Sequence, residues 1–321
     1  MDKESKILPA NAVSALVHDH VFESGKPSAE RGTRLVMWIT AAMMLVEISA
    51  GWYFNSMALL ADGWHMSSHA LAIGLSAFAY AAARKYARDP RFAFGTWKIE
   101  ILAGYTSAVS LVGIAALMAF SSFERLLSPQ PIHYREAIVI AVIGLVVNIA
   151  CALILGDAHH HGHDHHHGHG HAGDDDHHHH DLNLKAAYVH VIADAATSVL
   201  AIAALIGGWL WGWSWLDPLM GIAGAVLVAA WARNLLRETG RVLLDREMDA
   251  PVVAEIREVV EQSNNARITD LHVWRVGQHS YSCALCVVTA DASVKPSLLR
   301  AQLAMHEEIV HSTIEVQYAA R

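Results

Sequence analysis

Two short stretches of this 321-residue chain carry side chains suited to holding a metal ion. The first is Asp62-Gly-Trp-His65-Met-Ser-Ser-His69, and the second is His190-Val-Ile-Ala-Asp194. Residues four positions apart lie on one face of a helix, so the two histidines of the first stretch point the same way. The same spacing aligns His190 with Asp194. If the two faces meet, three imidazoles and one carboxylate form a four-ligand site for a divalent transition metal.

Both stretches lie in apolar runs, at residues 57–83 and 186–208. Each run is long enough to cross a bilayer as a helix, which takes roughly 20 apolar residues. Groups this polar are expensive in hydrocarbon and usually mark a path for an ion. The alternative is polar contact between helices without transport. Two pairs with matched spacing favour metal-ion transport.

The composition indicates a polytopic α-helical membrane protein. The chain is 54% hydrophobic and 17% charged, with a mean hydropathy of +0.28. Soluble domains are nearer a quarter charged. The formal net charge of −8 is concentrated in one acidic insert, so we expect no nucleic-acid partner.

The hydropathy pattern predicts six transmembrane helices within residues 35–246. They are expected at 35–54, 57–83, 101–120, 137–155, 186–208 and 216–233. Residues 1–34 read as an N-terminal tail. Lysine and arginine gather between 84 and 98 and again between 233 and 246. The positive-inside rule makes these segments, and therefore both termini, cytoplasmic.

Residues 247–321 have the pattern of a small cytoplasmic α+β domain. Helices are expected at 251–262 and 297–310, and strands at 271–276, 281–290 and 313–318. The order αββαβ predicts a two-layer, ferredoxin-like fold.

A low-complexity cytoplasmic loop at 157–181 holds thirteen of the 23 histidines and six aspartates. It has no hydrophobic residue larger than alanine, so it cannot bury a core and is expected to be disordered. Such a composition binds metal. The pattern leaves open whether the loop buffers metal or delivers it.

Several motifs resemble those of the cation diffusion facilitator family of metal/proton antiporters, and the resemblance covers nearly everything from residue 35 onward. It implies a transport site at the four ligands, exchange of metal for protons, a homodimer, and a bacterial inner membrane. The matching motifs are Glu47-x3-Gly51-x3-Asn55-Ser56-x-Ala58-Leu59-Leu60-Ala61-Asp62-x2-His65, Gly95-x2-Lys98-x-Glu100, Asn148, Asp217-Pro218 and Asp270-Leu271-His272-Val273-Trp274.

One departure bears on which metal is carried. Zinc-transporting members of the family commonly have aspartate where this chain has His69. Three imidazoles and one carboxylate resemble the branch associated with cobalt and nickel export. Imidazole suits Zn²⁺, Co²⁺ and Ni²⁺ alike, so zinc stays open. The metal is the transported substrate, and no resident cofactor is expected. Asp62 is a candidate to orient His65 from the second coordination shell.

Other functional classes of protein would require different residues. A membrane metalloenzyme needs an open metal position and a general base, such as the glutamate of H-E-x-x-H. The residues between His65 and His69 are Met, Ser and Ser, so we expect no enzyme. An importer of another family would not explain residues 247–321, and a sensor or scaffold would bind metal without ion flux. In that domain, His272 and Cys286 are better explained by packing than by ligation.

Overall fold

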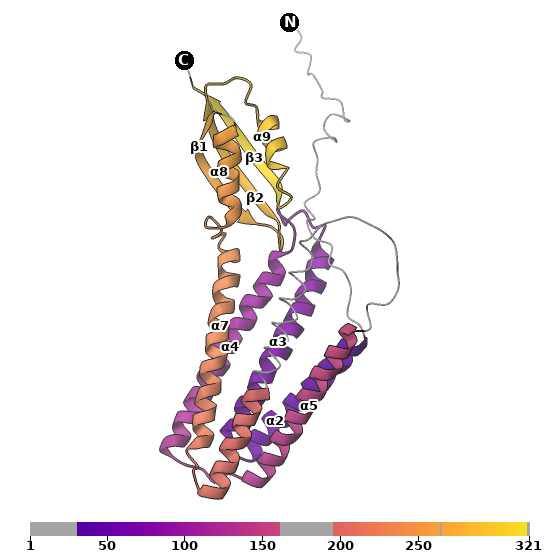
Figure 1. The fold of residues 1–321 in the computed structure, drawn as a ribbon, viewed down its shortest axis with the longest axis vertical. Coiled ribbons are helices and arrows are strands. Elements are labelled where there is room, and N and C mark those ends of the chain that lie inside the picture. Colours follow the sequence, from indigo (N-terminus) through magenta and orange to yellow (C-terminus); the bar gives the residue numbers. More distant parts are fainter. Residues whose placement is uncertain (1–30, 161–194, 264, 320–321) are drawn as a thin grey trace. The chain divides into compact units, whose positions relative to one another are not determined.

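The structure is a computed structural model that describes residues 31–160, 195–263 and 265–319. Long helices make up the described chain as far as Leu243 (Figure 1). A further apolar helix, Ala195–Trp211, begins at the first described residue after position 160. The long helices are α2 (Arg31–Tyr53), α3 (Met57–Tyr86), α4 (Lys98–Leu127), α5 (Tyr134–His160) and α7 (Leu216–Leu243).

Four described helices are long and apolar enough, by length and composition, to cross a membrane. Ala195–Trp211 is apolar but shorter within the described residues. The predicted apolar runs are confirmed as helices wherever they are described. Six crossings remain a prediction. The four candidate spans are α3, α4, residues 134–151 of α5, and α7.

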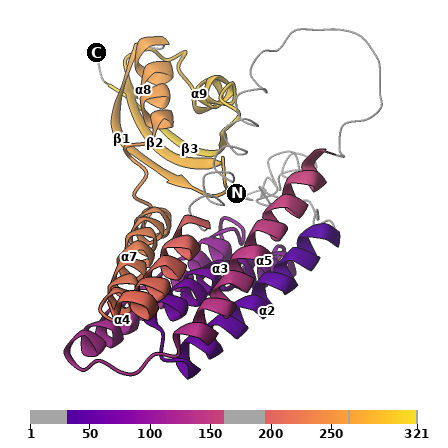
Figure 2. The ribbon, with the colours of Figure 1, turned by 60° about the horizontal axis from the view of Figure 1, so that its bottom comes forward.

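Small residues let the helices approach closely. A Cβ at Gly51 of α2 would lie 2.8 Å from the Leu60 amide nitrogen of α3, and one at Gly224 of α7 would lie 2.9 Å from the Ala61 Cβ. Figures 1 and 2 show α2 running alongside α5. This packing through small residues is typical of helices in a bilayer, where close backbone contact supplies much of the attraction.

The outward surface of the helices is strongly apolar. On α4, the side chains of Leu117 and Phe120 are 68% and 70% exposed. The four tryptophans at positions 209, 211, 213 and 215 are also exposed at the end of helix Ala195–Trp211. Apolar surface on this scale fits contact with lipid, and clustered tryptophans are typical of a membrane interface.

The described chain divides into two compact units. One comprises residues 31–75 and 106–236, without the undescribed segment, and the other comprises 76–105 and 237–319. The division of the chain falls inside α3, α4 and α7. The domain limits expected from the sequence, at residues 34 and 246, remain predictions.

The second unit contains a small mixed sheet. Strand β2 lies in the middle, antiparallel to β1 and parallel to β3. Alternate residues of β2, including Cys283 and Leu285, are buried in one core with apolar residues of both helices. The elements follow the order α8 (Pro251–Ser263), β1 (Ala266–Arg275), β2 (Tyr281–Thr289), α9 (Pro296–Leu303) and β3 (Ile309–Tyr318).

The predicted helix at 297–310 is wrong in its second half. Helix α9 ends at Leu303, and Ile309 already pairs with Tyr281 as the first residue of β3. The Tyr281 amide donates to the Glu308 carbonyl at 2.7 Å. Pairing with β2 buries the β-branched Ile309, which outweighs a helical continuation that the sequence pattern alone also allowed.

Polar and aromatic contacts tie together the separate segments of the second unit. The buried Glu247 carboxylate lies 3.5 Å from the Arg275 guanidinium and 3.9 Å from that of Arg241. The Phe94 ring contacts the Trp274 ring edge-on, with centroids 5.3 Å apart. The loop after α3, the end of α7 and strand β1 are therefore linked within this unit.

The two cysteines of β2 should differ in reactivity. Burial raises the pKa of the Cys283 thiol to about 11, whereas the Cys286 side chain is partly exposed. Because the thiolate is the nucleophile, iodoacetamide at about pH 8 should modify Cys286 at least ~10-fold faster than Cys283. Peptide mass spectrometry on the full-length protein measures both rates. Equal rates in the folded protein would contradict the burial of Cys283, and equal rates after denaturation are the control.

Candidate metal centre

The helix that carries the first two predicted ligands begins directly after a tight turn. Asn55 has a left-handed backbone (φ 59°), and the Ser56 amide donates to the Gly51 carbonyl at 2.9 Å. These features end α2 in the manner of a Schellman motif. The Ser56 hydroxyl then accepts a hydrogen bond from the Leu59 amide at 3.1 Å. Ser56 is therefore the N-cap of α3.

Asp217, in the first turn of α7, completes this cap from a distant part of the sequence. Its carboxylate accepts hydrogen bonds from the Ser56 hydroxyl (2.7 Å), the Met57 amide (2.7 Å) and the Ala58 amide (3.1 Å). Asp217 is 1% exposed. A carboxylate is well placed here, because the N-terminus of a helix has unpaired amides and a positive dipole end. The N-terminal ends of α3 and α7 are fixed to each other.

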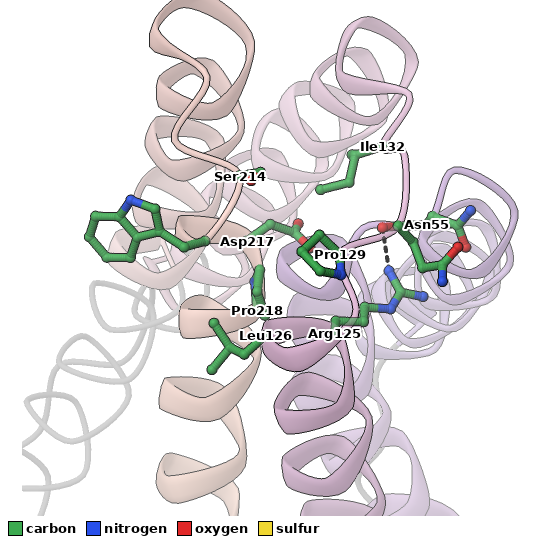
Figure 3. A pocket seen from close by; sticks show the side chains of 10 residues that line it. Asn55, Arg125, Leu126, Pro129, Ile132, Ser214, Asp217 and Pro218 are labelled. Atoms are coloured by element: carbon green, nitrogen blue, oxygen red, sulfur yellow. Dashed lines mark hydrogen bonds between the residues drawn. The ribbon is translucent and has the colours of Figure 1, made fainter.

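A small cavity of about 50 Å³ lies beside this junction (Figure 3). Arg125, near the end of α4, points toward Asn55 and donates to its carbonyl. Asp217 and Pro218 line the opposite part of the same cavity. The cavity is too small for a substrate beyond water or a bare ion. We interpret it as part of the polar network that holds the helix ends.

A larger cavity of about 190 Å³ lies farther along α3, and Asp62 and His65 line it. The remaining lining residues come from α3, helix Ala195–Trp211 and α7, and most are small or apolar. Asp62 is 4% exposed, and its carboxylate accepts a hydrogen bond from the Ser198 hydroxyl at 2.8 Å. The cavity is therefore lined by one imidazole, one oriented carboxylate and Thr197, among small or apolar residues.

The predicted ligands are only partly described. His65 lines the larger cavity, and His69 follows one turn later on α3, although its side chain lies outside the description. His190 and Asp194 lie outside the described residues. Within residues 31–160 and 195–319, no group of three His, Cys, Asp or Glu side chains is close enough to hold a metal. The four-ligand site remains a prediction.

Two features of the site are not predicted from the sequence: the hydrogen bond between Ser198 and Asp62, and the capping role of Asp217. Nothing in the sequence indicated that Ser198 would bind the Asp62 carboxylate, because the two residues are 136 positions apart. The sequence identifies Asp217 only as part of the Asp217-Pro218 motif. An acidic residue before proline, at the start of an apolar helix, was the available signal for a buried cap.

The exposed face of the sheet also carries potential ligands. Asp270, Cys286 and Glu315 are successive partners across the three strands. The His272 Nε2 atom lies 3.1 Å from an Asp270 carboxylate oxygen, and the Gln317 amide donates to Glu315 at 2.8 Å. Polar side chains of this face form hydrogen bonds with one another, which fits the interpretation of His272 as a surface residue.

Comparison with known proteins places the helices in a family. The family model described as "Cation efflux transmembrane domain" matches residues 33–244. This range includes α3, the larger cavity and all four predicted ligands.

Similar proteins extend over nearly the whole chain. The "Cadmium, cobalt and zinc/H(+)-K(+) antiporter" of Bacillus subtilis is 30% identical over 86% of this chain and 85% of its own length. The "Zinc transporter ZitB" of Escherichia coli is 31% identical over 94% of this chain and 93% of its own length. The "Metal cation efflux system protein CzcD" of Cupriavidus metallidurans is 28% identical over 94% and 90%, respectively.

Removing the distant cap should loosen the bundle. Asp217→Ala leaves the Met57 and Ala58 amides without their acceptor, so unfolding should become easier by roughly 1–3 kcal/mol. The measurement is the denaturation midpoint in detergent. Glu238→Ala, an exposed carboxylate on the same helix, is the matched control. An unchanged midpoint for Asp217→Ala would show that the cap does not stabilise the fold.

Proposed function

The chain belongs to the cation diffusion facilitator family of metal cation efflux transporters, whose members are not enzymes, and we propose that it exports cytoplasmic Co²⁺ or Ni²⁺ in exchange for protons. The metal binds between α3 and the helix predicted at residues 186–208, held by His65, His69, His190 and Asp194. Zn²⁺ is a further substrate of the same site.

The position of His65 carries this proposal. Its side chain lines the larger cavity together with Thr197 and Ala201 of helix Ala195–Trp211. Positions 190, 194, 197 and 201 have the spacing of one helix face. A helix that continues toward residue 190 would therefore bring the second pair of ligands to the wall that faces His65. Asp62 supports that imidazole as a second-shell acceptor.

Proton exchange follows from the chemistry of the ligands. Imidazole binds metal only in its neutral form, and its ordinary pKa is about 6.5, so protons arriving from outside compete with the metal. The name of the Bacillus subtilis relative includes H(+) antiport, which supports the same coupling here. Asp194 compensates part of the charge of the metal.

The choice of metal depends on His69. A site with a third imidazole in place of a carboxylate resembles that of the branch of the family associated with cobalt and nickel export, although imidazole suits zinc equally well. The competing proposal is export of Zn²⁺ or Cd²⁺ through the same site. The names of the similar proteins include zinc and cadmium, which support this second candidate, and cobalt, which supports the first.

The accompanying architecture is also a proposal. Six helices cross the inner membrane of a bacterium, with both termini cytoplasmic because lysine and arginine gather on that side. Residues 247–321 form a ferredoxin-like domain through which the protein dimerises. The loop at 157–181 binds metal ions on the cytoplasmic side.

Transport in proteoliposomes under a pH gradient tests the function. Wild type should accumulate Co²⁺ or Ni²⁺, as read by a metal-sensitive dye. Asp194→Ala should lower the rate by more than the roughly 10–100-fold expected for losing an outer-shell partner, because it removes a direct ligand. His69→Asp should shift the preference toward Zn²⁺ or Cd²⁺.

The controls separate the alternatives. Glu238→Gln, on an exposed part of α7, should transport like wild type. Preferred Zn²⁺ or Cd²⁺ flux in the wild type would favour the second candidate over the first. Metal binding without flux under any gradient would overturn transport altogether, and flux independent of the pH gradient would overturn proton exchange.

A further inference from the structure

Glu47 on α2 is a buried carboxyl group that the proposed transport site does not use. Its side chain is 1% exposed. Neither of its two carboxyl oxygens has a hydrogen-bond partner among the described residues. In this it differs from Asp217 and Asp62, whose oxygens accept hydrogen bonds from identified donors.

Glycines of two neighbouring helices leave room for this side chain. A methyl group at Gly144 of α5 would overlap the Glu47 Oε1 atom. A Cβ at Gly63 of α3 would lie 3.1 Å from the Glu47 Cβ. The carboxyl group therefore lies where α2, α3 and α5 meet, and Gly144 makes the space that it occupies.

The charges around Glu47 do not stabilise an ionised carboxylate. Among the described groups, Asp62 on α3 is the titratable neighbour that interacts with it electrostatically, and it carries the same sign of charge. The neighbour on α5 is Gly144, and a Cβ built there would also lie 3.4 Å from the Met43 Cε atom of α2, so neither residue adds a charge. An ionised carboxylate buried without donors is far more expensive than a neutral one. Glu47 therefore holds a proton when no cation is nearby.

We propose that Glu47 is a proton-binding site whose occupancy is linked to that of the metal site, an inference that rests on the proposed metal/proton exchange. Asp62 connects the two places, because it interacts with Glu47 and also lines the cavity with His65. A divalent cation in that cavity offsets the charge of Asp62. The Glu47 O–H bond then breaks, its proton passes to water, and the carboxylate remains.

The coupling runs in both directions. When the metal leaves, the carboxylate again faces Asp62 without a compensating cation and takes up a proton from water. Linkage requires this reciprocity: if metal binding favours loss of the proton, then protonation must favour loss of the metal by the same factor. Glu47 thus adds a proton to those that the histidine ligands exchange.

Counting protons on metal binding tests the proposal. Purified full-length protein in weakly buffered solution is titrated with Co²⁺ or Zn²⁺, and a pH indicator reports the protons released per metal bound. Glu47→Gln keeps the shape of the side chain but cannot ionise, so it should release about one proton fewer than wild type. Comparing variants removes the contribution of the histidine-rich loop, which both proteins share.

Two further variants serve as controls. Glu47→Asp retains a group that can be protonated, so it should release as many protons per metal as the wild type. If Glu47 had a purely structural role, Glu47→Asp and Glu47→Gln would release equal numbers of protons. Glu136→Gln, an exposed glutamate on α5, should match the wild type. If wild type and Glu47→Gln both bind metal and release equal numbers of protons, the proposed role of Glu47 is overturned, but the proposed metal/proton exchange is not. No metal-linked proton release by wild type overturns the proposed exchange.

If Glu47→Gln does not fold, infrared difference spectroscopy on wild type and Glu47→Asp gives the answer. Wild type should lose the C=O band of a protonated carboxylic acid when Zn²⁺ is added, and this band should shift in Glu47→Asp. A spectrum without such a band, or with an identical band in both proteins, overturns the proposal.

Discussion

The helix bundle depends on one electrostatic constraint: a carboxylate buried among apolar helices must be paired with donors or hold a proton. Asp217 is paired by one hydroxyl and two amides, and it joins the N-terminal ends of α3 and α7. Asp62 accepts a hydrogen bond from Ser198 and lines a cavity. Glu47 has no hydrogen-bond donor among the described residues. The hydrogen bonds of each carboxyl group therefore indicate its role: Asp217 is structural, whereas Asp62 and Glu47 are suited to interact with an ion or a proton.

The sequence was a good guide to where helices lie and a poorer one to where they end. Apolar runs mark the part of a helix that lipid can surround, but α3, α4 and α7 all continue beyond their runs through polar residues, which are equally compatible with helical geometry. The helix predicted at 297–310 is wrong in its second half for another reason. Its apolar spacing suits a helix, and only the presence of β2 as a partner makes residues 309 and 310 a strand.

For the candidate site, the sequence predicts which residues share one face of a helix, but it does not predict which residues of different helices are in contact. The positions of His65 and His69 on α3 followed from the sequence alone. The bond from Ser198 to Asp62 and the space that Gly144 leaves for Glu47 join segments about a hundred residues apart or more, so only a folded structure reveals them. Similarity to metal cation efflux proteins gives the class of substrate. The ligand set, which includes residues outside the description, remains a prediction.

The cap on α3 also has a consequence for biosynthesis. Asp217 follows Met57 by 160 positions, so the ribosome completes the first turn of α3 long before it makes the acceptor for that turn. Until then, the Met57 and Ala58 amides depend on water or on other temporary partners. Chains generally fold from the N-terminus during synthesis. Of the described helices, α2 and α3 are the first two, and the cap that follows the turn between them is completed only after α7 has been synthesised.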